Sequence, residues 1–285
     1  MAIYTIHEPS KTGIYSRLPQ YGSTADVVIK RNLMIDDIPV LNCYLDDGSK
    51  KPLFIFVHGY TQNKESNLQI IYELATEGFF VVAPDCAGHG QRGNAEGYRM
   101  CGLLQKTTAE VDKLIAHYQG QEDIDLEQIF LAGASFGGVV TYSYLVSGKY
   151  PIKAAAVLSS TPDLEAVLRL PLGFVDPETV DGKKPFVPPT ETEKAETFAI
   201  GQRISPLNHW ETIGKTPLMI IHGTEDEVLS LSGEIKLYEL LAPTASDEQL
   251  QLHHFKGIGH ASTPEMKNYL LDWFASKRAA QNCPK

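Results

Sequence analysis

A serine between glycines, in Gly133-Ala134-Ser135-Phe136-Gly137, is the stretch of this chain best suited to chemistry. It matches G-x-S-x-G, a pattern in which the serine occupies a strained turn between a strand and a helix. The apolar residues before it indicate a buried strand, and "FGGVVTYSYLV" after it indicates a helix. Glycines two residues before and after the serine let the backbone pass closely. The pattern predicts a nucleophilic hydroxyl at Ser135, although a serine that only caps a helix would fit the same letters.

A serine nucleophile needs a base, and that base needs an acid to orient it. Asp226 follows the apolar stretch "PLMIIHG", and His260 lies in "GIGHA" after the last predicted strand. The order Ser, Asp, His along the chain is the one that accompanies this motif. A single loop aspartate or histidine is usually only a turn or surface residue, but both occur here in the required order and places. We therefore expect Ser135 as nucleophile, His260 as general base and Asp226 as the acid.

Other residues near these positions could take part. Glu225 and Glu227 flank Asp226, and either could be the acid if the loop bends differently. His89, in "DCAGHGQR", precedes the serine along the chain. We expect His89 to be structural or to form part of a pocket wall.

The oxyanion of a tetrahedral intermediate needs backbone donors. One is expected to be the N–H of Phe136, which follows the nucleophile, and the other comes from the loop after an earlier strand. His58-Gly59-Tyr60 follows the apolar stretch "LFIFV", so we expect the N–H of Tyr60 as the second donor. A plain strand-to-helix turn would also explain these three residues. His58 is, in addition, a candidate substrate-binding residue.

Alternating strands and helices must position these residues. Short apolar stretches of the kind found in strands covered on both faces begin at Leu53, Phe79, Ile129, Ala154 and Pro217, and a last strand begins at Leu250. Helical patterns lie between them, at Glu65–Glu77, Leu103–Tyr118, Phe136–Val146 and Ser230–Leu241, and a closing helix begins at Glu265. The sequence predicts an α/β fold with a doubly wound, mostly parallel sheet. Ligands of such sheets bind at the carboxyl ends of the strands, where Ser135, Asp226 and His260 are predicted to lie.

Two segments depart from this alternation. Asp26–Ile35 and Ile38–Leu45 read as strands joined by a two-residue turn, which predicts an antiparallel hairpin. Residues 161–213 are rich in proline and threonine and fall between two sheet strands. We interpret this segment as a lid-like insertion in a single domain that spans residues 1–285. Its candidate substrate-binding residues are Phe174, Phe198 and Trp210, and the alternative is that these side chains only cover the end of the sheet.

Composition excludes several classes of partner. A formal net charge of −10 disfavours nucleic acid and anionic membrane surfaces. The four cysteines show no paired spacing, which indicates free thiols in a reducing compartment. Neither a leader pattern nor an apolar stretch long enough for a membrane span is present in the sequence. We expect a cytoplasmic protein with a small-molecule substrate, and leave open an assembly of identical copies.

At the level of motifs, the chain resembles the α/β-hydrolase superfamily. The resemblance covers Asp26–Lys277 and is carried by "VHGYTQNKES", "PDCAGHGQR", "GASFGG" and "GIGHA". Within the superfamily the chain is similar to small bacterial serine esterases near the dienelactone-hydrolase and prolyl-oligopeptidase-like groups. Dienelactone hydrolases proper have a cysteine where this chain has Ser135, so their substrate is not carried over.

The resemblance implies a Ser135–Asp226–His260 triad that hydrolyses carboxylic esters through an acyl-enzyme, without a metal or cofactor. Thioesters, amides or small peptides are alternative substrates. A ligand-binding relative without catalysis is the alternative from another class, and a missing triad residue would be its signature.

Overall fold

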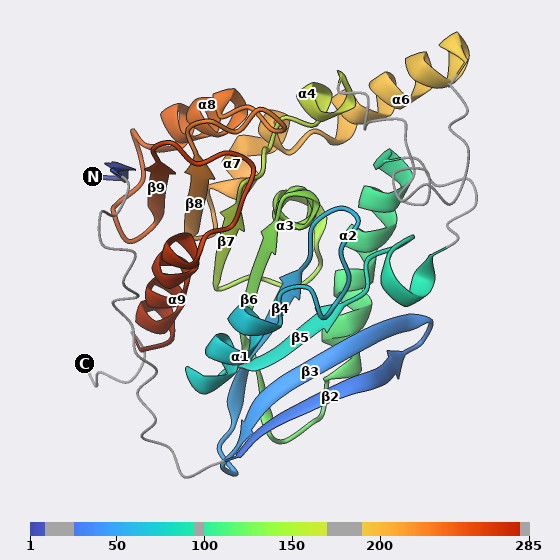
Figure 1. Ribbon diagram of the computed structural model, residues 1–285, viewed down its shortest axis with the longest axis vertical. Helices are drawn as coiled ribbons and strands as arrows, with labels where there is room; N and C mark the ends of the chain where they lie inside the picture. Colours follow the sequence, from blue (N-terminus) through green and yellow to red (C-terminus); the bar gives the residue numbers. More distant parts are fainter. Residues whose placement is uncertain (9–25, 94–99, 170–189, 280–285) are drawn as a thin grey trace.

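A mostly parallel β-sheet runs through the molecule, with helices on both of its faces (Figure 1). The computed structural model describes residues 1–8, 26–93, 100–169 and 190–279. Within them the sheet has nine strands in the order β1-β9-β8-β7-β6-β4-β5-β3-β2. The strands are β1 (Ile3–His7), β2 (Asp26–Ile35), β3 (Ile38–Asp46), β4 (Lys51–Val57), β5 (Phe80–Pro84), β6 (Ile124–Ala134), β7 (Ala154–Leu158), β8 (Leu218–Gly223) and β9 (Leu250–Phe255). The predicted doubly wound sheet is confirmed.

The antiparallel hairpin is also confirmed. Strands β2 and β3 pair around a turn at Asp36 and Asp37, where Ile35 faces Ile38. Asp36 has a φ of 53°, in the left-handed region that aspartate tolerates better than most residues. Strand β3 continues antiparallel to β5 and so joins the hairpin to the parallel part of the sheet.

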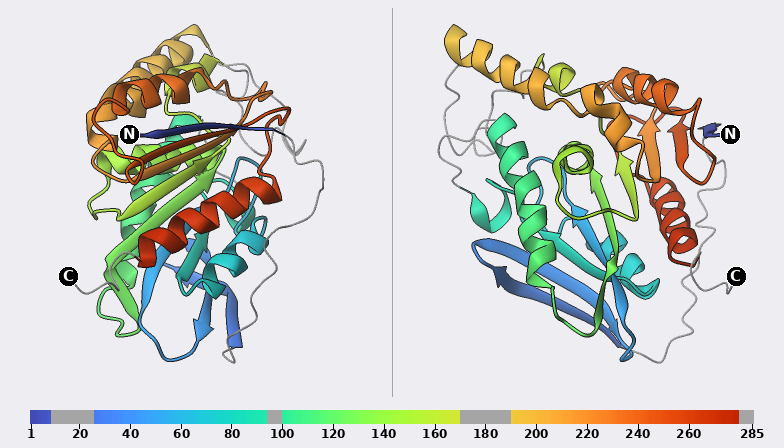
Figure 2. Two further views of the ribbon diagram at one scale, coloured as in Figure 1. Left: turned by 90° about the vertical axis from the view of Figure 1, so that its left-hand side faces the viewer. Right: turned by 180° about the vertical axis from the view of Figure 1, so that it is seen from behind.

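Helices cover the sheet in two layers (Figure 2). Helices α1 (Leu68–Thr76) and α9 (Pro264–Ala279) pack apolar side chains such as Ile71 and Phe274 on one face. Helices α2 (Met100–His117), α3 (Phe136–Ser147) and α8 (Ser232–Leu241) contribute Val111, Val140 and Leu237 to the core on the other face. All five coincide with predicted helical patterns. The central parts of the strands between the layers, such as residues 53–57 of β4 and 129–134 of β6, are apolar because both of their faces are buried.

Two α-helices and two shorter helical turns are described in the segment between β7 and β8. They are α4 (Leu164–Arg169), α6 (Glu191–Ile204), the 3₁₀ turn η3 (Pro206–His209) and α7 (Trp210–Ile213). A further 3₁₀ turn, η1 (Gly90–Arg92), follows β5. Helices α4 and α6 pack closely enough that a Cβ on Gly201 would lie 2.2 Å from Leu168 Cδ1. In the part of the chain that the structure describes, no helix is both long and apolar enough to cross a lipid bilayer.

Candidate active site

Ser135 stands in a strained turn at the junction of β6 and α3. Its φ of 53° and ψ of −116° place a non-glycine residue outside the usual regions. The flanking glycines are required by contact, since a Cβ on Gly133 would lie 2.2 Å from the carbonyl oxygen of Gly137. A Cβ on Gly137 would lie 2.1 Å from the carbonyl oxygen of Val57 in β4. The close approach expected from the glycine spacing is therefore present.

Neighbouring strands hold this turn in place. The N–H of Ser135 donates to the carbonyl of Leu158 at 2.9 Å, and the hydroxyl of Ser160 donates to the carbonyl of Ser135 at 2.9 Å. The N–H of Gly138 also bonds to Ser135, at 2.9 Å. Backbone strain at a single residue persists only where its surroundings enforce it, and the end of β7 does so here.

His260 bridges Ser135 and Asp226. Its Nε2 lies 2.9 Å from Ser135 Oγ, and its Nδ1 lies 2.7 Å from Asp226 Oδ2. A carboxylate can only accept, so Nδ1 carries the hydrogen and Nε2 accepts from the serine hydroxyl. The loop of Asp226 is joined to the loop of His260 by the N–H of Glu225, which donates to the carbonyl of Ile258 at 2.9 Å. The hydroxyl of Ser159 donates to the carbonyl of Ala261 at 2.7 Å. The structure thus brings together the three residues expected from the sequence.

Asp226 is the acid that the structure places against His260. Its Oδ1 accepts from the N–H groups of Val228 at 2.9 Å and Leu229 at 2.8 Å. Burial opposes ionisation of Asp226, but hydrogen bonds from His222, His260 and Leu229 outweigh it and hold the pKa of the carboxyl below its ordinary value. Its neighbours along the chain, at 225 and 227, are exposed to solvent. Of the three acids in this loop, Asp226 alone is hydrogen-bonded to His260 in the described structure.

Two buried residues behind Asp226 were missed by the sequence reasoning. His222 Nε2 lies 2.9 Å from Asp226 Oδ2, and His222 Nδ1 lies 2.7 Å from Glu234 Oε2. A histidine at the end of an otherwise apolar strand, in "PLMIIHG", was a signal that could have pointed to the first of them. Glu234 gave no such signal, because an acidic residue in the first turn of a helix is ordinary.

Tyr60 and Phe136 lie beside the serine, as expected of the oxyanion donors. Phe136 is the first residue of α3, where a backbone N–H has no partner within the helix. The loop that carries Tyr60 is closed by Gly59 N–H, which donates to Gln62 Oε1 at 3.0 Å. Thr61 in this loop has a φ of 60°, so its backbone is strained. The rings of Tyr60 and Phe136 are 6.1 Å apart.

His58 is a candidate substrate-binding residue from the sequence, but in the structure it connects two loops. It is buried, its Nδ1–H donates to the carbonyl of Gly59 at 2.8 Å, and its Nε2 accepts from the N–H of Cys86 at 3.0 Å. Burial lowers the pKa of His58 to about 4, so the ring is neutral at pH 7. Both nitrogens are used to tie the loop of Tyr60 to the chain after β5.

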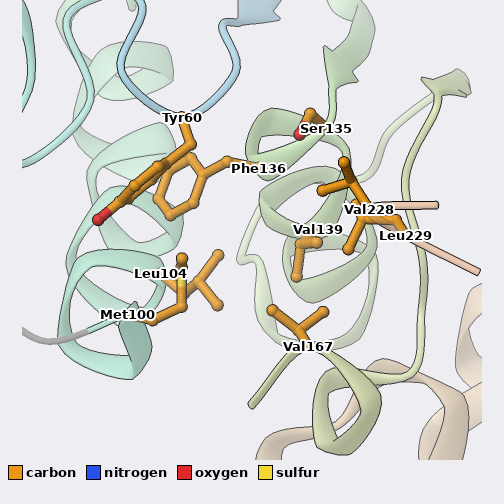
Figure 3. Close-up of a pocket in the computed structure, with 9 residues that line it drawn as sticks. All are labelled: Tyr60, Met100, Leu104, Ser135, Phe136, Val139, Val167, Val228 and Leu229. Carbon is orange, nitrogen blue, oxygen red and sulfur yellow. The ribbon is translucent and has the colours of Figure 1, made fainter. Parts of the chain in front are cut away.

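An apolar pocket opens beside Ser135 (Figure 3). Its volume is about 420 Å³, open solvent included. Met100, Leu104 and Val167 lie across it from the serine (Figure 3). The lining residues come from five segments of the chain: Tyr60, Met100, Leu104, Ser135, Phe136, Val139, Val167, Val228 and Leu229.

Of the substrate-binding residues expected in the insertion, none lines this pocket in the described structure. Phe198 packs against the core, and Trp210 lines a separate hollow with Leu241 and Leu250. Phe174 lies outside the described residues. The insertion instead contributes Val167 of α4. Helical amphipathicity identifies the inward face of a helix but does not distinguish a pocket wall from core. The sequence therefore did not predict most of the residues that line the pocket.

The chain is similar to several known proteins. The model of the family described as serine aminopeptidase, S33, matches residues 48–171. The chain is 26% identical to YitV of Bacillus subtilis (strain 168) over 253 residues, which is 85% of this chain and 96% of YitV. It is 24% identical to the esterase YjfP of Escherichia coli (strain K12) over 251 residues, which is 84% of this chain and 94% of YjfP.

A solved structure supports the same architecture. TT1662 from Thermus thermophilus superposes with a TM-score of 0.69 at 22% sequence identity, and the alignment covers 90% of this chain and all of that one. Likeness at this identity concerns the fold. The sheet order, the serine turn and these comparisons show that the chain has the α/β-hydrolase fold, as its motifs indicated.

Proposed function

We propose that this protein is a serine hydrolase that cleaves carboxylic esters of small molecules through an acyl-enzyme intermediate. The observation that carries the proposal is the hydrogen-bonded series Ser135–His260–Asp226 at the mouth of an apolar pocket. The name of the related YjfP, an esterase, supports the same reaction. Fold alone would not, because this fold serves many activities.

The geometry suits acid–base catalysis by His260. Nε2, 2.9 Å from Ser135 Oγ, takes the hydroxyl proton as the oxygen attacks the ester carbon. The imidazolium that forms donates through Nδ1 to Asp226, which is buried and ionised. His260 then gives the proton to the leaving alkoxide. In the second half of the reaction His260 takes a proton from a water molecule that attacks the acyl carbon, and returns that proton to Ser135 Oγ as the acid product leaves.

The N–H groups of Phe136 and Tyr60 are the oxyanion donors of this proposal. Phe136 N–H lies at the start of α3, where the helix dipole favours developing negative charge. The clamp that His58 forms between two loops would keep the Tyr60 segment rigid. A preorganised donor of this kind contributes about 3 kcal/mol to stabilising the transition state.

The lining of the pocket defines the class of acyl group. The described residues that form its wall carry apolar or uncharged side chains, so an uncharged, apolar acyl chain fits and an anionic one does not. Each methylene that the wall buries is worth about 0.8 kcal/mol. Leu104 and Val167 stand across from the nucleophile and limit the length of the chain that the pocket accepts.

Peptide hydrolysis is the second candidate, favoured by the matching aminopeptidase family. An aminopeptidase must bind the ammonium group of its substrate, which calls for acidic side chains in the pocket. No carboxylate lies in the pocket wall within the described residues. Ester hydrolysis is therefore the better-supported reaction.

Covalent labelling combined with a substrate panel tests the proposal. An organophosphonate is expected to modify Ser135, as identified by the mass of its peptide, and to abolish hydrolysis of p-nitrophenyl esters. Esters of acetate and butyrate are expected to be cleaved, while aminoacyl anilides of the same size are cleaved far more slowly. Faster cleavage of the anilides would favour the peptidase, and labelling of another residue would refute the assignment of Ser135.

A further inference from the structure

Asp226 shares one carboxylate oxygen between two imidazole rings. Besides His260, its Oδ2 faces Nε2 of His222, a residue of β8, at 2.9 Å. The same nitrogen lies 3.0 Å from the carbonyl oxygen of Leu229. Both neighbours are acceptors, so Nε2 of His222 must carry a hydrogen and donate it.

Glu234 fixes the other side of the His222 ring. Its Oε2 lies 2.7 Å from Nδ1, and the side chains of His222, Asp226 and Glu234 are all 0% exposed. Burial disfavours the imidazolium, but the charge of Glu234 and the hydrogen bonds to both carboxylates outweigh it and raise the pKa of His222 to about 10. At neutral pH His222 is therefore an imidazolium between Asp226 and Glu234, and burial raises the pKa of the Glu234 carboxyl above its ordinary value.

The remaining groups around His222 add no competing charge at neutral pH. His254 of β9 has a pKa lowered to about 4 by burial and by the charge of His222, so it is neutral. Tyr142 of α3 has a pKa raised well above its ordinary value by burial and by Glu234. The electrostatic setting of Asp226 on this side is thus set by His222 and Glu234.

A buried charged pair is an expensive way to stabilise a fold. Desolvation can exceed the attraction, and apolar side chains of similar volume often serve as well or better. This pair, however, directs the N–H that Glu234 does not bind toward Asp226, the acid that orients the catalytic base, as well as toward the carbonyl of Leu229. A catalytic use accounts for its retention better than a structural one.

We propose that His222, held by Glu234, is a positioning residue for ester hydrolysis: its Nε2–H fixes Asp226 Oδ2 opposite His260 and withdraws negative charge from that oxygen. The proposal rests on the Ser135–His260–Asp226 assignment made above. With this donor present, Asp226 stabilises a positive charge on the general base less strongly. Without it, that stabilisation increases, activity is lost at a higher pH, and the orientation of Asp226 is less well defined.

The test compares His222→Leu with His222→Gln. Leucine removes the donor, and we expect kcat to fall about 10- to 100-fold, as is typical when a group that orients an active-site ligand is lost. KM should change little, because His222 does not line the pocket. The acid limb of the kcat/KM profile should move up by about one pH unit, which corresponds to a tenfold change in proton affinity. Glutamine keeps an amide N–H near the position of Nε2 and should restore most of kcat and the wild-type acid limb.

A double variant separates catalysis from folding. His222→Leu combined with Glu234→Met removes both buried polar groups, so we expect a thermal midpoint close to that of the wild type. The loss in kcat and the shifted acid limb should nevertheless persist. A folded double variant with wild-type kcat and acid limb would overturn the proposal, as would glutamine being as impaired as leucine. If Ser135→Ala remained active, the triad itself would be wrong; if it is inactive and only the His222 results fail, the triad stands.

Discussion

At the scale of residues, the site depends on a few atoms whose protonation is dictated by their neighbours. Asp226 accepts four hydrogen bonds, two from backbone N–H groups and two from imidazoles. This environment keeps it ionised and directs His260 to present an unprotonated Nε2 to Ser135. His260 presents a free lone pair on Nε2 only while Asp226 accepts the hydrogen bond from Nδ1.

Asp226→Asn tests that dependence. An asparagine can present an N–H to His260, which would favour the wrong tautomer and lower kcat by about four powers of ten. Initial rates on p-nitrophenyl acetate measure the effect. The neighbouring Glu225→Gln and Glu227→Gln are the matched controls, and each should stay within about threefold of the wild type. A larger loss from either control than from Asp226→Asn would mean that the acid is misassigned.

The grouping of Ser135, His260 and Asp226 could be predicted from the sequence because motif order and strand position are local properties. Gly133 and Gly137 marked the turn, and the chain order of the three side chains identified their roles. His222 was harder to assign, because its function depends on Asp226 and Glu234 facing it from a loop and a helix. That juxtaposition is set by packing and not by spacing along the chain.

At the scale of elements, helices contribute much of the wall of the apolar pocket beside Ser135. Helix α2 contributes Met100 and Leu104, and α4 of the insertion contributes Val167. The sequence indicated that the insertion would lie near the catalytic edge but assigned the wall to Phe198 and Trp210, which lie elsewhere in the structure. A helical period locates the apolar face of a helix, while its tertiary partner decides whether that face meets the core or a ligand.

Leu104→Ala tests the role of α2 in substrate choice. Removing the side chain lengthens the pocket, so the ratio of kcat/KM for octanoate to that for butyrate should rise about tenfold, the value of roughly two buried methylenes. Leu103→Ala is the control, since Leu103 is equally buried on α2 but does not line the pocket. Both variants should lose about 2–5 kcal/mol of stability. If both changed the ratio alike, the pocket would not select the acyl chain.

At the scale of the whole molecule, the first strand closes one edge of the sheet. Strand β1 pairs in parallel with β9, so Ile3–His7 lies beside residues almost 250 positions away (Figure 1). His7 Nε2 lies 2.9 Å from His253 Nδ1, and the Tyr4 hydroxyl lies 3.0 Å from His254 Nδ1. The sequence pattern alone predicts no strand at Ile3–His7. Five residues with two exposed apolar side chains carry too weak a pattern to be recognised without the partner strand.

These buried histidines should make the fold sensitive to acid. Burial lowers the pKa of His253 from 6.5 to about 4, so between these values the unfolded chain binds a proton that the folded protein does not. Stability therefore falls as the pH drops from 6.5 toward 4, by about 1.4 kcal/mol per pH unit for each such group. Urea midpoints at pH 7, 6 and 5 should show a shallower decline for His253→Gln than for the wild type. Identical slopes would mean that His253 is not buried in its neutral form.

The central claim is that Ser135 is the nucleophile of an ester hydrolase. The most direct measurement is kcat/KM of Ser135→Ala on p-nitrophenyl acetate and butyrate, with the thermal midpoint as a check on folding. Ser147→Ala is the control, because this serine is exposed at the other end of the same helix. We predict a loss of several powers of ten for Ser135→Ala at an unchanged midpoint, and wild-type activity for Ser147→Ala. A folded Ser135→Ala protein that kept a tenth of the wild-type rate would contradict the account.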